Sequence, residues 1–336
     1  MTTIIDNTGP TKVSQSKIKT WRRCRRAHFN KYVLKLRKRI KSRPLVFGSI
    51  VHEMIEADAN GDDPFEKLNE IGKVDKKLFK QERELYGEII EDIRCIMEDY
   101  FDYWADNPKA ILYSRKNKRS AEHEFEIDLG EDILFTGKID AVGKSRSMRW
   151  LVEHKTFKRM PNEDMRWKSI QSAVYIRAIQ MMGWWNDIEG TLWDYIHNRP
   201  PNMPQLTSTG KISQAKLNSL PSRVEAFLAT QGAKPEDVPK LWDYVMENRA
   251  SYFVRTYTPM NERVIDDTWE DFVMSAREIR DYGQVAKQRT VEQHCSWCDY
   301  EKLCRAEVTG LDLDFIIERE YVYDDAKEET PEVEED

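Results

Sequence analysis

Four cysteines at distant positions constrain the fold of this chain more than any other feature of its sequence. Cys295, Cys298 and Cys304 follow one another with two and then five residues between them, and Cys24 lies 271 positions before the first of these. Four thiolates at this spacing can hold an iron–sulfur cluster. A cluster bound in this way would join the N-terminal segment of the chain to its C-terminal segment.

Zinc is the alternative metal, because Zn²⁺ also binds four thiolates and His28 or His294 could replace one of them. The fifth cysteine, Cys95, lies in a segment that looks helical, where we expect a plain buried thiol. Thiolates that are available to bind metal indicate a reducing compartment rather than a disulfide scaffold. We therefore expect a cytoplasmic protein.

The length and composition favour one large domain. The chain has 336 residues and is 40% hydrophobic, which is enough to bury a substantial core, and no clear linker divides it. We expect a single domain over residues 1–323. No apolar run approaches the roughly 18 residues that span a bilayer, and the first ten residues lack both a basic leader and an apolar segment. A membrane is not expected among the partners.

Charge is distributed unevenly along the chain. The formal net charge is −6, but residues 324–336 hold eight acids and one lysine, and this acidic tail is predicted to be disordered. Residues 7–52 hold 14 Lys or Arg and no Asp or Glu. This basic run is interleaved with Trp21, Phe29 and Tyr32, and aromatic rings beside cations suit single-stranded nucleic acid. A solvated helix face is the plainer alternative.

The spacing of apolar residues predicts an α/β fold with helical insertions. A helix capped by Ser14 or Ser16 is expected near the N-terminus, and a second helix carries His52 beside a buried stripe. Alternation with a period of two predicts a strand from Glu122 to Leu129 whose acidic residues face water. The other expected elements are strands at 133–142, 149–156, 191–197 and 252–257, helices at 169–182 and 261–282, and helical insertions at about 60–118 and 201–250.

Two carboxylates and a lysine lie where consecutive strands can bring them together. Asp140 ends one expected strand, and Glu153 and Lys155 lie on the next, after twelve intervening residues. Side chains at i and i+2 share one face of a strand, so Glu153 and Lys155 point the same way and His154 points to the other face. Oxygen ligands of this kind suit Mg²⁺ or Mn²⁺, and a lysine beside them can stabilise developing negative charge. An exposed ion pair is the plain alternative for Glu-X-Lys on a strand.

The order of these motifs resembles the PD-(D/E)XK nuclease superfamily, and within it the RecB-like branch. That branch has Gly-X-X-X-His on an early helix, then Gly-X-X-Asp, Glu-X-Lys and Gln-X-X-X-Tyr. The matching positions here are Gly48 to His52, Gly137 to Asp140, Glu153 to Lys155 and Gln171 to Tyr175. One departure is Ile139, which stands where the superfamily name has a proline that is often absent in this branch.

The resemblance implies a fold and a set of roles. The fold would be a restriction-endonuclease-like core, with a mixed central sheet flanked by helices. Mg²⁺ or Mn²⁺ would be bound by the side chains of His52, Asp140 and Glu153 and by the backbone carbonyl of His154. The catalytic residues would be Lys155, Glu153 and Asp140. Gln171 and Tyr175 would position the DNA strand or support Lys155, while His52 could instead only satisfy a hydrogen bond.

The cysteines resemble one iron–sulfur subgroup of these nucleases. Its members pair an N-terminal cysteine with a C-terminal Cys-X2-Cys-X5-Cys around a [4Fe–4S] cluster, and they include AddB-type recombination nucleases, the small exonucleases of CRISPR spacer acquisition and phage relatives. The implied ligands here are Cys24, Cys295, Cys298 and Cys304. Such a cluster would act as a structural staple, since it closes a loop of roughly 270 residues.

The function expected from these features is a metal-dependent DNA exonuclease. It would act on free ends, preferably of single strands, in recombination, replication or end processing. The sequence has no P-loop motif, so any unwinding would fall to a helicase partner, and a recombinase or integrase is another expected partner. The alternatives are an accessory protein that holds DNA ends for an integrase or recombinase, a structure-specific endonuclease and an RNA-directed enzyme.

Overall fold

The computed structural model describes residues 9–73, 80–105, 111–113, 121–145 and 147–324. These residues divide between two units, each assembled from segments that are distant in sequence. Unit 1 takes residues from 1–41, 124–137 and 265–336, and unit 2 takes residues from 42–123 and 138–264. Residues 325–336 of the expected acidic tail lie outside the described residues. None of the described helices is long and apolar enough to cross a membrane.

Unit 2 is built on a mixed sheet of five strands. These are β3 (Ile111–Tyr113), β6 (Ala141–Ser145), β7 (Met148–Phe157), β8 (Ile188–His197) and β9 (Phe253–Pro259), and their order in the sheet is β3-β6-β7-β8-β9. β7 and β8 pair in parallel, while the other neighbours are antiparallel. Residues 150–154 of the central strand β7 are all buried, as expected for a strand that is covered on both faces.

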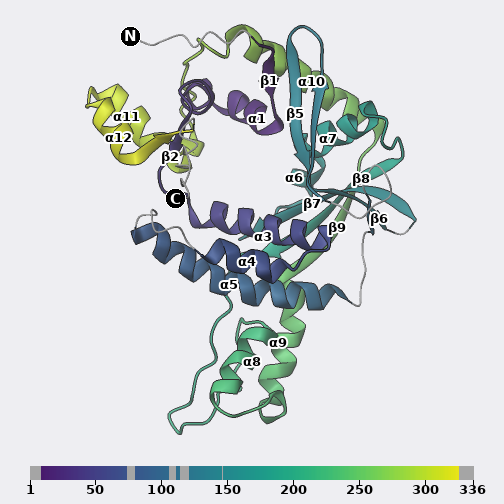
Figure 1. Ribbon diagram of the computed structural model, residues 1–336, viewed down its shortest axis with the longest axis vertical. Helices are drawn as coiled ribbons and strands as arrows, with labels where there is room; N and C mark the ends of the chain where they lie inside the picture. The colour runs from purple at the N-terminus through teal and green to yellow at the C-terminus, as the bar shows by residue number, and fades with distance from the viewer. Residues whose placement is uncertain (1–8, 74–79, 106–110, 114–120, 146, 325–336) are drawn as a thin grey trace, which may run out of the picture. The chain divides into compact units, whose positions relative to one another are not determined.

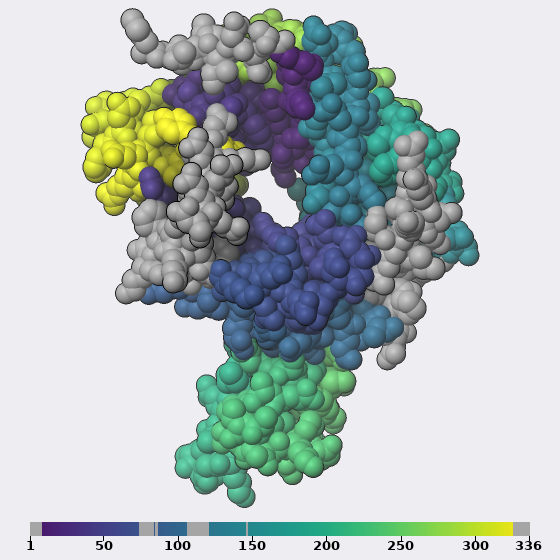
Figure 2. Space-filling view, in the orientation of Figure 1, coloured from purple at the N-terminus to yellow at the C-terminus, as the bar shows by residue number. Residues whose placement is uncertain are grey.

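Helices cover this sheet and extend unit 2. α3 (Arg43–Asn60) packs against β7, and α7 (Ile170–Met181) is the crossover that links the parallel strands β7 and β8. α8 (Pro221–Thr230) and α9 (Pro239–Tyr252) pack on each other around an apolar cluster of their own, the green lobe in Figures 1 and 2. The remaining helices of this unit are α4 (Pro64–Gly72), α5 (Lys80–Ala105), α6 (Glu163–Trp167) and the short η2 (Pro235–Asp237).

Unit 1 brings together segments from both ends of the sequence. Its strands are β1 (Thr11–Val13), β2 (Leu36–Lys38), most of β4 (His123–Asp128) and β5 (Ile133–Ile139), and β10 (Tyr321–Tyr323). β1 pairs in parallel with β5, and β2 pairs with β10 in antiparallel register. Its helices are α1 (Gln15–Arg23), α2 (Arg25–His28), η1 (Phe29–Val33), most of α10 (Glu262–Tyr282), η3 (Gln293–Trp297), α11 (Glu301–Thr309) and α12 (Leu313–Glu320).

The predicted α/β class is confirmed, with sheets flanked by helices, and one local prediction needs correction. The strand expected at 133–142 is two strands, β5 and β6, which belong to different sheets and meet at Asp140. The N-terminal helix begins at the predicted cap, since the Ser14 side chain accepts a hydrogen bond from Lys17 N. It is then interrupted at Cys24, whose backbone is extended (φ −165°, ψ 115°), before α2 begins.

The basic run of residues 7–52 carries less free charge than its sequence indicates. Acidic residues that are distant in sequence pair with many of its cations. The pairs are Lys12–Glu126, Arg25–Glu278, Arg26–Glu307, Arg37–Asp324 and Lys38–Asp299 in unit 1, and Arg43–Asp92 in unit 2. Folding therefore partly neutralises the positive charge of this run.

Candidate metal centre and four-cysteine pocket

His52 reaches the central strand because α3 approaches it closely. Gly48 lies one turn before His52, and a Cβ atom there would be 3.4 Å from Oγ1 of Thr156 on β7. His52 Nε2 lies 3.0 Å from the backbone carbonyl oxygen of His154, and Nδ1 lies 3.1 Å from Oε1 of Glu122. Burial alone would lower the pKa of His52, but the Glu122 hydrogen bond and the nearby carboxylates raise it above its ordinary value.

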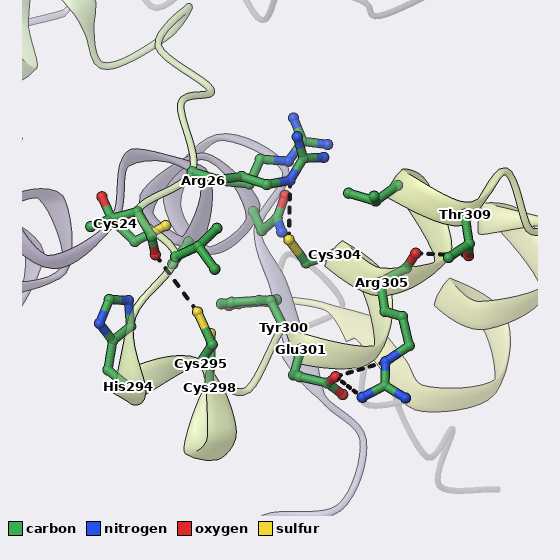
Figure 3. Close-up of a pocket in the computed structure, with 16 residues that line it drawn as sticks. Cys24, Arg26, His294, Cys295, Cys298, Tyr300, Glu301, Cys304, Arg305 and Thr309 are labelled. Carbon is green, nitrogen blue, oxygen red and sulfur yellow. Dashed lines mark hydrogen bonds and ion pairs between the residues drawn. The ribbon is translucent and has the colours of Figure 1, made fainter.

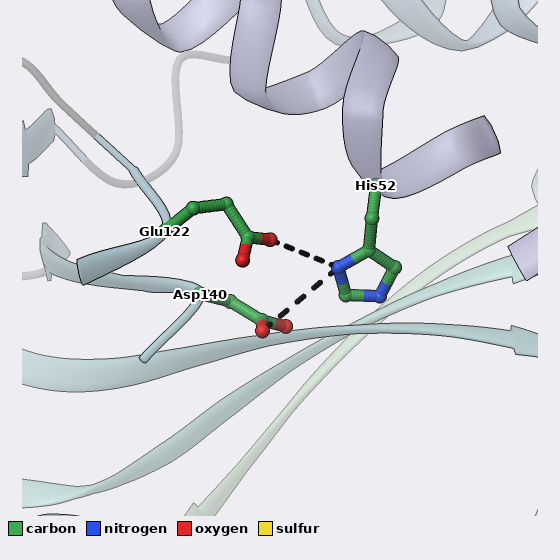
Figure 4. A group of neighbouring side chains, drawn as sticks. All are labelled: His52, Glu122 and Asp140. Atoms are coloured by element: carbon green, nitrogen blue, oxygen red, sulfur yellow. Dashed lines mark hydrogen bonds and ion pairs between the residues drawn. The ribbon is translucent and has the colours of Figure 1, made fainter. Parts of the chain in front are cut away.

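Glu122 is a site residue that the sequence analysis missed. The ligand atoms of His52, Glu122 and Asp140 all lie within 4.8 Å of one another. Figure 4 shows the three side chains pointing toward one another. Glu122 was expected on the wet face of a strand, yet its side chain is only 9% exposed. Its φ of 58° sets it off from β4, and its N–H donates to the Asp140 carbonyl at 2.8 Å. The only sequence signal was an acid at the start of an alternating run, which the period-two pattern assigned to solvent.

Asp140 lies at the junction of β5 and β6, where the chain passes from one sheet to another. Its side chain is buried, and Oδ2 accepts a hydrogen bond of 2.9 Å from the backbone N–H of His154. Oδ1 lies 3.9 Å from His52 Nδ1. An imidazole nitrogen and two carboxylates form a donor set that could hold a divalent metal ion.

Glu153 and Lys155 point to the same side of β7, as their spacing predicts. Glu153 is fully buried, and its Oε2 accepts hydrogen bonds from Lys155 Nζ at 2.8 Å and Gln171 Nε2 at 2.7 Å. Its other oxygen, Oε1, makes no hydrogen bond with a described residue. Burial and the charge of Asp140 outweigh the effect of Lys155 and raise the pKa of Glu153 to about 7.

Lys155 and Tyr175 both remain protonated at neutral pH. Burial would lower the pKa of Lys155, but the charges of Glu153 and Asp140 raise it above its ordinary value. Tyr175 is buried on α7, one turn after Gln171, and burial together with the same two carboxylates raises the pKa of its hydroxyl group. Lys155 therefore provides a fixed positive charge and Tyr175 a neutral hydroxyl group.

The side chain of His154 points away from the metal group, and a buried network holds it there. Its Nδ1 lies 3.3 Å from Oδ2 of Asp194 on the neighbouring strand β8. The same Asp194 oxygen accepts hydrogen bonds from Tyr100 at 2.5 Å and Arg255 at 2.6 Å. Although burial opposes ionisation, Arg255 and His154 hold the pKa of Asp194 well below its usual range. This network fixes the strand segment whose backbone contacts both His52 and Asp140.

The four cysteines line one pocket of about 340 Å³ in unit 1 (Figure 3). Cys24 comes from the break between α1 and α2, Cys295 and Cys298 from the η3 segment, and Cys304 from α11. All four are free thiols. The guanidinium of Arg289 donates to the Cys304 sulfur at 3.1 Å. His294 also lines this pocket, whereas His28 lies in a different one.

The sulfur atoms are more widely spaced than a zinc site requires. In the described part of the chain, the one group of three possible ligands that gathers within 4.8 Å is His52, Glu122 and Asp140, so no three cysteine sulfurs do so. Zn–S bonds of about 2.3 Å in a tetrahedral site would place sulfurs about 3.8 Å apart.

Comparison with protein families matches residues 12–305 to the family described as PD-(D/E)XK nuclease superfamily. No match to a curated protein was found. Among solved structures, one titled "Crystal structure of SSO0001" matches at 12% identity, covering 88% of this chain and 86% of that chain. Its TM-score is 0.29, a likeness too low to carry an argument.

Proposed function

This chain belongs to the PD-(D/E)XK nuclease superfamily, whose members are metal-dependent nucleases, and from that membership we propose that it is a DNA exonuclease. It would hydrolyse phosphodiester bonds from free ends, preferably of single-stranded DNA. The observation that carries the proposal is the gathering of His52, Glu122 and Asp140 beside the Glu153–Lys155 pair. One small region of unit 2 thus holds both a donor set for a cation and a fixed ammonium group.

The proposed metal ligands are His52, Glu122, Asp140 and Glu153, with the backbone carbonyl of His154. Two of these groups have an atom that is available to a cation, as judged among the described residues. Glu153 Oε1 makes no hydrogen bond, and His52 Nδ1 contacts only carboxylates. When bound, Mg²⁺ or Mn²⁺ would neutralise charge on the scissile phosphate and lower the pKa of a coordinated water.

Lys155 and Gln171 both contact Glu153, one of the proposed metal ligands. The Lys155 ammonium lies against Glu153. The Lys155 side chain is 35% exposed, so a phosphate oxygen could approach it from solvent. There it would stabilise the negative charge that grows in the transition state. Gln171 donates to Glu153 Oε2, the same oxygen that Lys155 contacts, and we propose that this bond orients the carboxylate. Tyr175, one turn after Gln171, is proposed to position the DNA strand.

The four-cysteine pocket is proposed to hold a [4Fe–4S] cluster, with zinc as the alternative. The ligands would be Cys24, Cys295, Cys298 and Cys304, which would staple the two ends of unit 1. Anaerobically purified protein should then be brown and contain about four irons. A colourless protein with one zinc would contradict the cluster.

The biological setting is proposed from the resemblance to the RecB-like iron–sulfur nucleases. The AddB-type and spacer-acquisition exonucleases act on DNA ends, so a helicase, recombinase or integrase would be a fitting partner. Residues 1–323 would then work as one nuclease domain, with α8 and α9 as a helical insertion. An accessory protein that holds DNA ends is the second candidate, but the Lys155–Glu153 pair and the neighbouring carboxylates favour activity.

The test compares linear and circular single-stranded DNA of matched sequence in Mn²⁺. Wild type should degrade the linear strand and leave the circle, because only the linear strand has ends. Lys155→Ala should lose this activity, whereas Lys158→Ala, which removes an exposed lysine three residues away, should retain it. Cleavage of the circle would indicate an endonuclease, and cleavage of neither DNA would favour the accessory protein. Ribonucleotide strands of the same sequence test the RNA-directed alternative.

A further inference from the structure

The segment between β7 and α7 begins and ends at residues of the candidate site. Lys155 lies near the end of β7, and Gln171 lies in the first turn of α7, where it donates to Glu153. A chain spans at most about 3.6 Å per residue, so the Cα atom of Arg159, four residues after Lys155, lies within about 14 Å of it. The same bound holds for Trp167, four residues before Gln171. The segment therefore stays close to the metal centre.

The short helix α6 gives this segment a defined conformation. Asn162 caps the helix, since its side chain accepts a backbone hydrogen bond of 2.9 Å. Nη1 of Arg166 donates to the Pro161 carbonyl at 2.8 Å, and α6 packs against β9. The side chains of this segment are thus presented from a helix that is joined to the sheet of unit 2.

Arg166 also shows on which side of the sheet the segment lies. Tyr195 on β8 is the register partner of Lys155 on β7. Burial raises the pKa of the Tyr195 hydroxyl group, and the positive charges of Arg166 and Lys155 both oppose this rise. The guanidinium of Arg166 and the ammonium of Lys155 therefore both lie near the same hydroxyl group.

Three cations of the segment have no carboxylate partner among the described residues. They are Arg159, Arg166 and Lys168, of which Arg159 and Lys168 are exposed. The acids of the segment, Glu163 and Asp164, lie in the first turn of α6, where the helix dipole favours negative charge. The exposed cations are therefore available to an anionic ligand.

Trp167 presents an aromatic ring to solvent beside these cations. It is 43% exposed, and the Lys168 ammonium lies 5.0 Å from the centre of its ring. An exposed ring gives a flat face on which an unpaired base can stack, and a cation beside it can contact the phosphate of the same nucleotide. In a duplex, neighbouring base pairs already cover the faces of each base, so this arrangement suits a single strand.

We propose that residues 159–168 bind a single strand of DNA next to the metal centre. Trp167 stacks on an unpaired base, while Lys168 and Arg159 contact phosphates of the same strand. This inference rests on the proposed function, which supplies DNA as the substrate class. It adds the residues that prefer a single strand over a duplex.

The first experiment measures binding of a labelled single-stranded oligonucleotide by fluorescence anisotropy, without divalent metal so that cleavage plays no part. Trp167→Ala should weaken binding at least about fivefold, as expected for the loss of one stacked base. Trp167→Phe keeps an aromatic face and should stay within about twofold of wild type. A strand of the same length without bases should bind wild type and Trp167→Ala equally, because it has phosphates but nothing to stack.

The second experiment repeats the titration at several salt concentrations. Lys168→Met should lower the slope of log affinity against log salt by about 0.7, which corresponds to one phosphate contact on a single strand. Lys216→Met is the matched control. Lys216 is also an exposed lysine of unit 2 whose ammonium lies over an aromatic ring, 5.5 Å from the centre of Tyr244, and its loss should leave the slope unchanged.

The inference is overturned if Trp167→Ala, with wild-type thermal unfolding, binds the strand as tightly as wild type does. It is also overturned if wild type binds no single strand, or if the strand without bases shows the same loss of affinity. Cleavage of linear DNA by wild type, together with unchanged binding by Trp167→Ala, would refute this inference and leave the exonuclease proposal standing. Binding that depends on Trp167 without any cleavage would support the inference and favour the accessory protein.

Discussion

At the scale of single residues, the candidate metal centre depends on groups whose ordinary behaviour is altered by their neighbours. Burial raises the pKa of Glu153, and two carboxylates raise the pKa of His52. His52 and Lys138 lower the pKa of Glu122, although burial opposes them. Such opposing shifts in one small space are typical of functional sites. A bound cation would relieve the like-charge crowding.

Glu122 gives the sharpest residue-scale test of the metal group. Glu122→Gln should weaken Mn²⁺ binding about tenfold or more, because a charged oxygen ligand is replaced by a neutral one. Glu124→Gln removes an exposed carboxylate two residues away and should leave the affinity unchanged. Binding is measured by titration calorimetry or by the Mn²⁺ paramagnetic resonance signal. Equal affinity in both variants would remove Glu122 from the ligand set.

Asp99 makes a residue-scale prediction about pH. It is buried on α5, and burial raises its pKa to about 6, although Ser222 and Arg249 act in the opposite direction. The folded-state pKa is therefore above the unfolded value, so protonation favours the folded state. This contribution is present at low pH and is lost as pH rises from about 4 to about 6, with up to about 3 kcal/mol at stake.

Denaturant unfolding from pH 4 to pH 7 checks this prediction. Asp99→Asn should unfold with less loss of stability across that range than wild type, because asparagine stays neutral. The exposed Asp243→Asn should follow the wild-type curve. A wild-type slope that persists in Asp99→Asn would assign the pH dependence to other groups.

At the scale of elements, one close backbone approach shapes the sheet of unit 2. Gly190 lets β8 approach β9. A Cβ atom at Gly190 would lie 2.2 Å from the backbone carbonyl oxygen of Thr258, which no side-chain motion can relieve. The pairing of β8 with β9 thus requires glycine at this position.

Gly190→Ala should destabilise unit 2 by about 2–4 kcal/mol, because a strand must move to admit one methyl group. The matched control is Gly87→Ala on the exposed side of α5, where nothing lies within 4 Å of the new Cβ. That substitution should stabilise the helix by up to about 1 kcal/mol. Both values come from urea unfolding followed by circular dichroism, and similar small effects in the two variants would contradict the argument.

Sequence patterns predicted regular helices and strands better than they predicted local irregularities of the backbone. Alternation and helical spacing predicted β7, α7 and the edge strand β9, because each is a regular stretch with one dominant periodicity. The break at Cys24 and the positive φ of Glu122 were not predictable, since long-range contacts impose both. The acidic partners of the basic run could not be predicted for the same reason. Arg26 and Glu307, for example, form an ion pair although they are far apart in sequence.

At the scale of the whole molecule, the four-cysteine pocket and the β2–β10 pairing join the same two distant stretches of chain. If these cysteines hold the proposed cluster, Cys304→Ser should lose most of the iron. It should also lower the stability of unit 1 by as much as about 5 kcal/mol, because the metal no longer closes a long loop of chain. Cys95→Ser is the control, because burial raises the pKa of that thiol to about 12 and its sulfur contacts Ser222 in unit 2.

Iron and sulfide are measured per chain, together with thermal unfolding. Cys95→Ser should keep wild-type iron content. Loss of zinc in place of iron in Cys304→Ser would identify the alternative metal, and unchanged metal content in that variant would remove Cys304 from the site. Mn²⁺ binding to unit 2 serves as the readout that the rest of the molecule is intact.

The pairing of β2 with β10 also limits when unit 1 can finish folding during synthesis. Residues 36–38 leave the exit tunnel long before residues 321–323, which are their partners. At about 5–20 residues per second, that interval is roughly 15–60 s. Every segment of unit 2 has been synthesised by residue 264, whereas β2 and Cys24 must wait for the last strand. All of unit 2, with its candidate metal centre, can therefore be synthesised before residues 36–38 gain their partner strand.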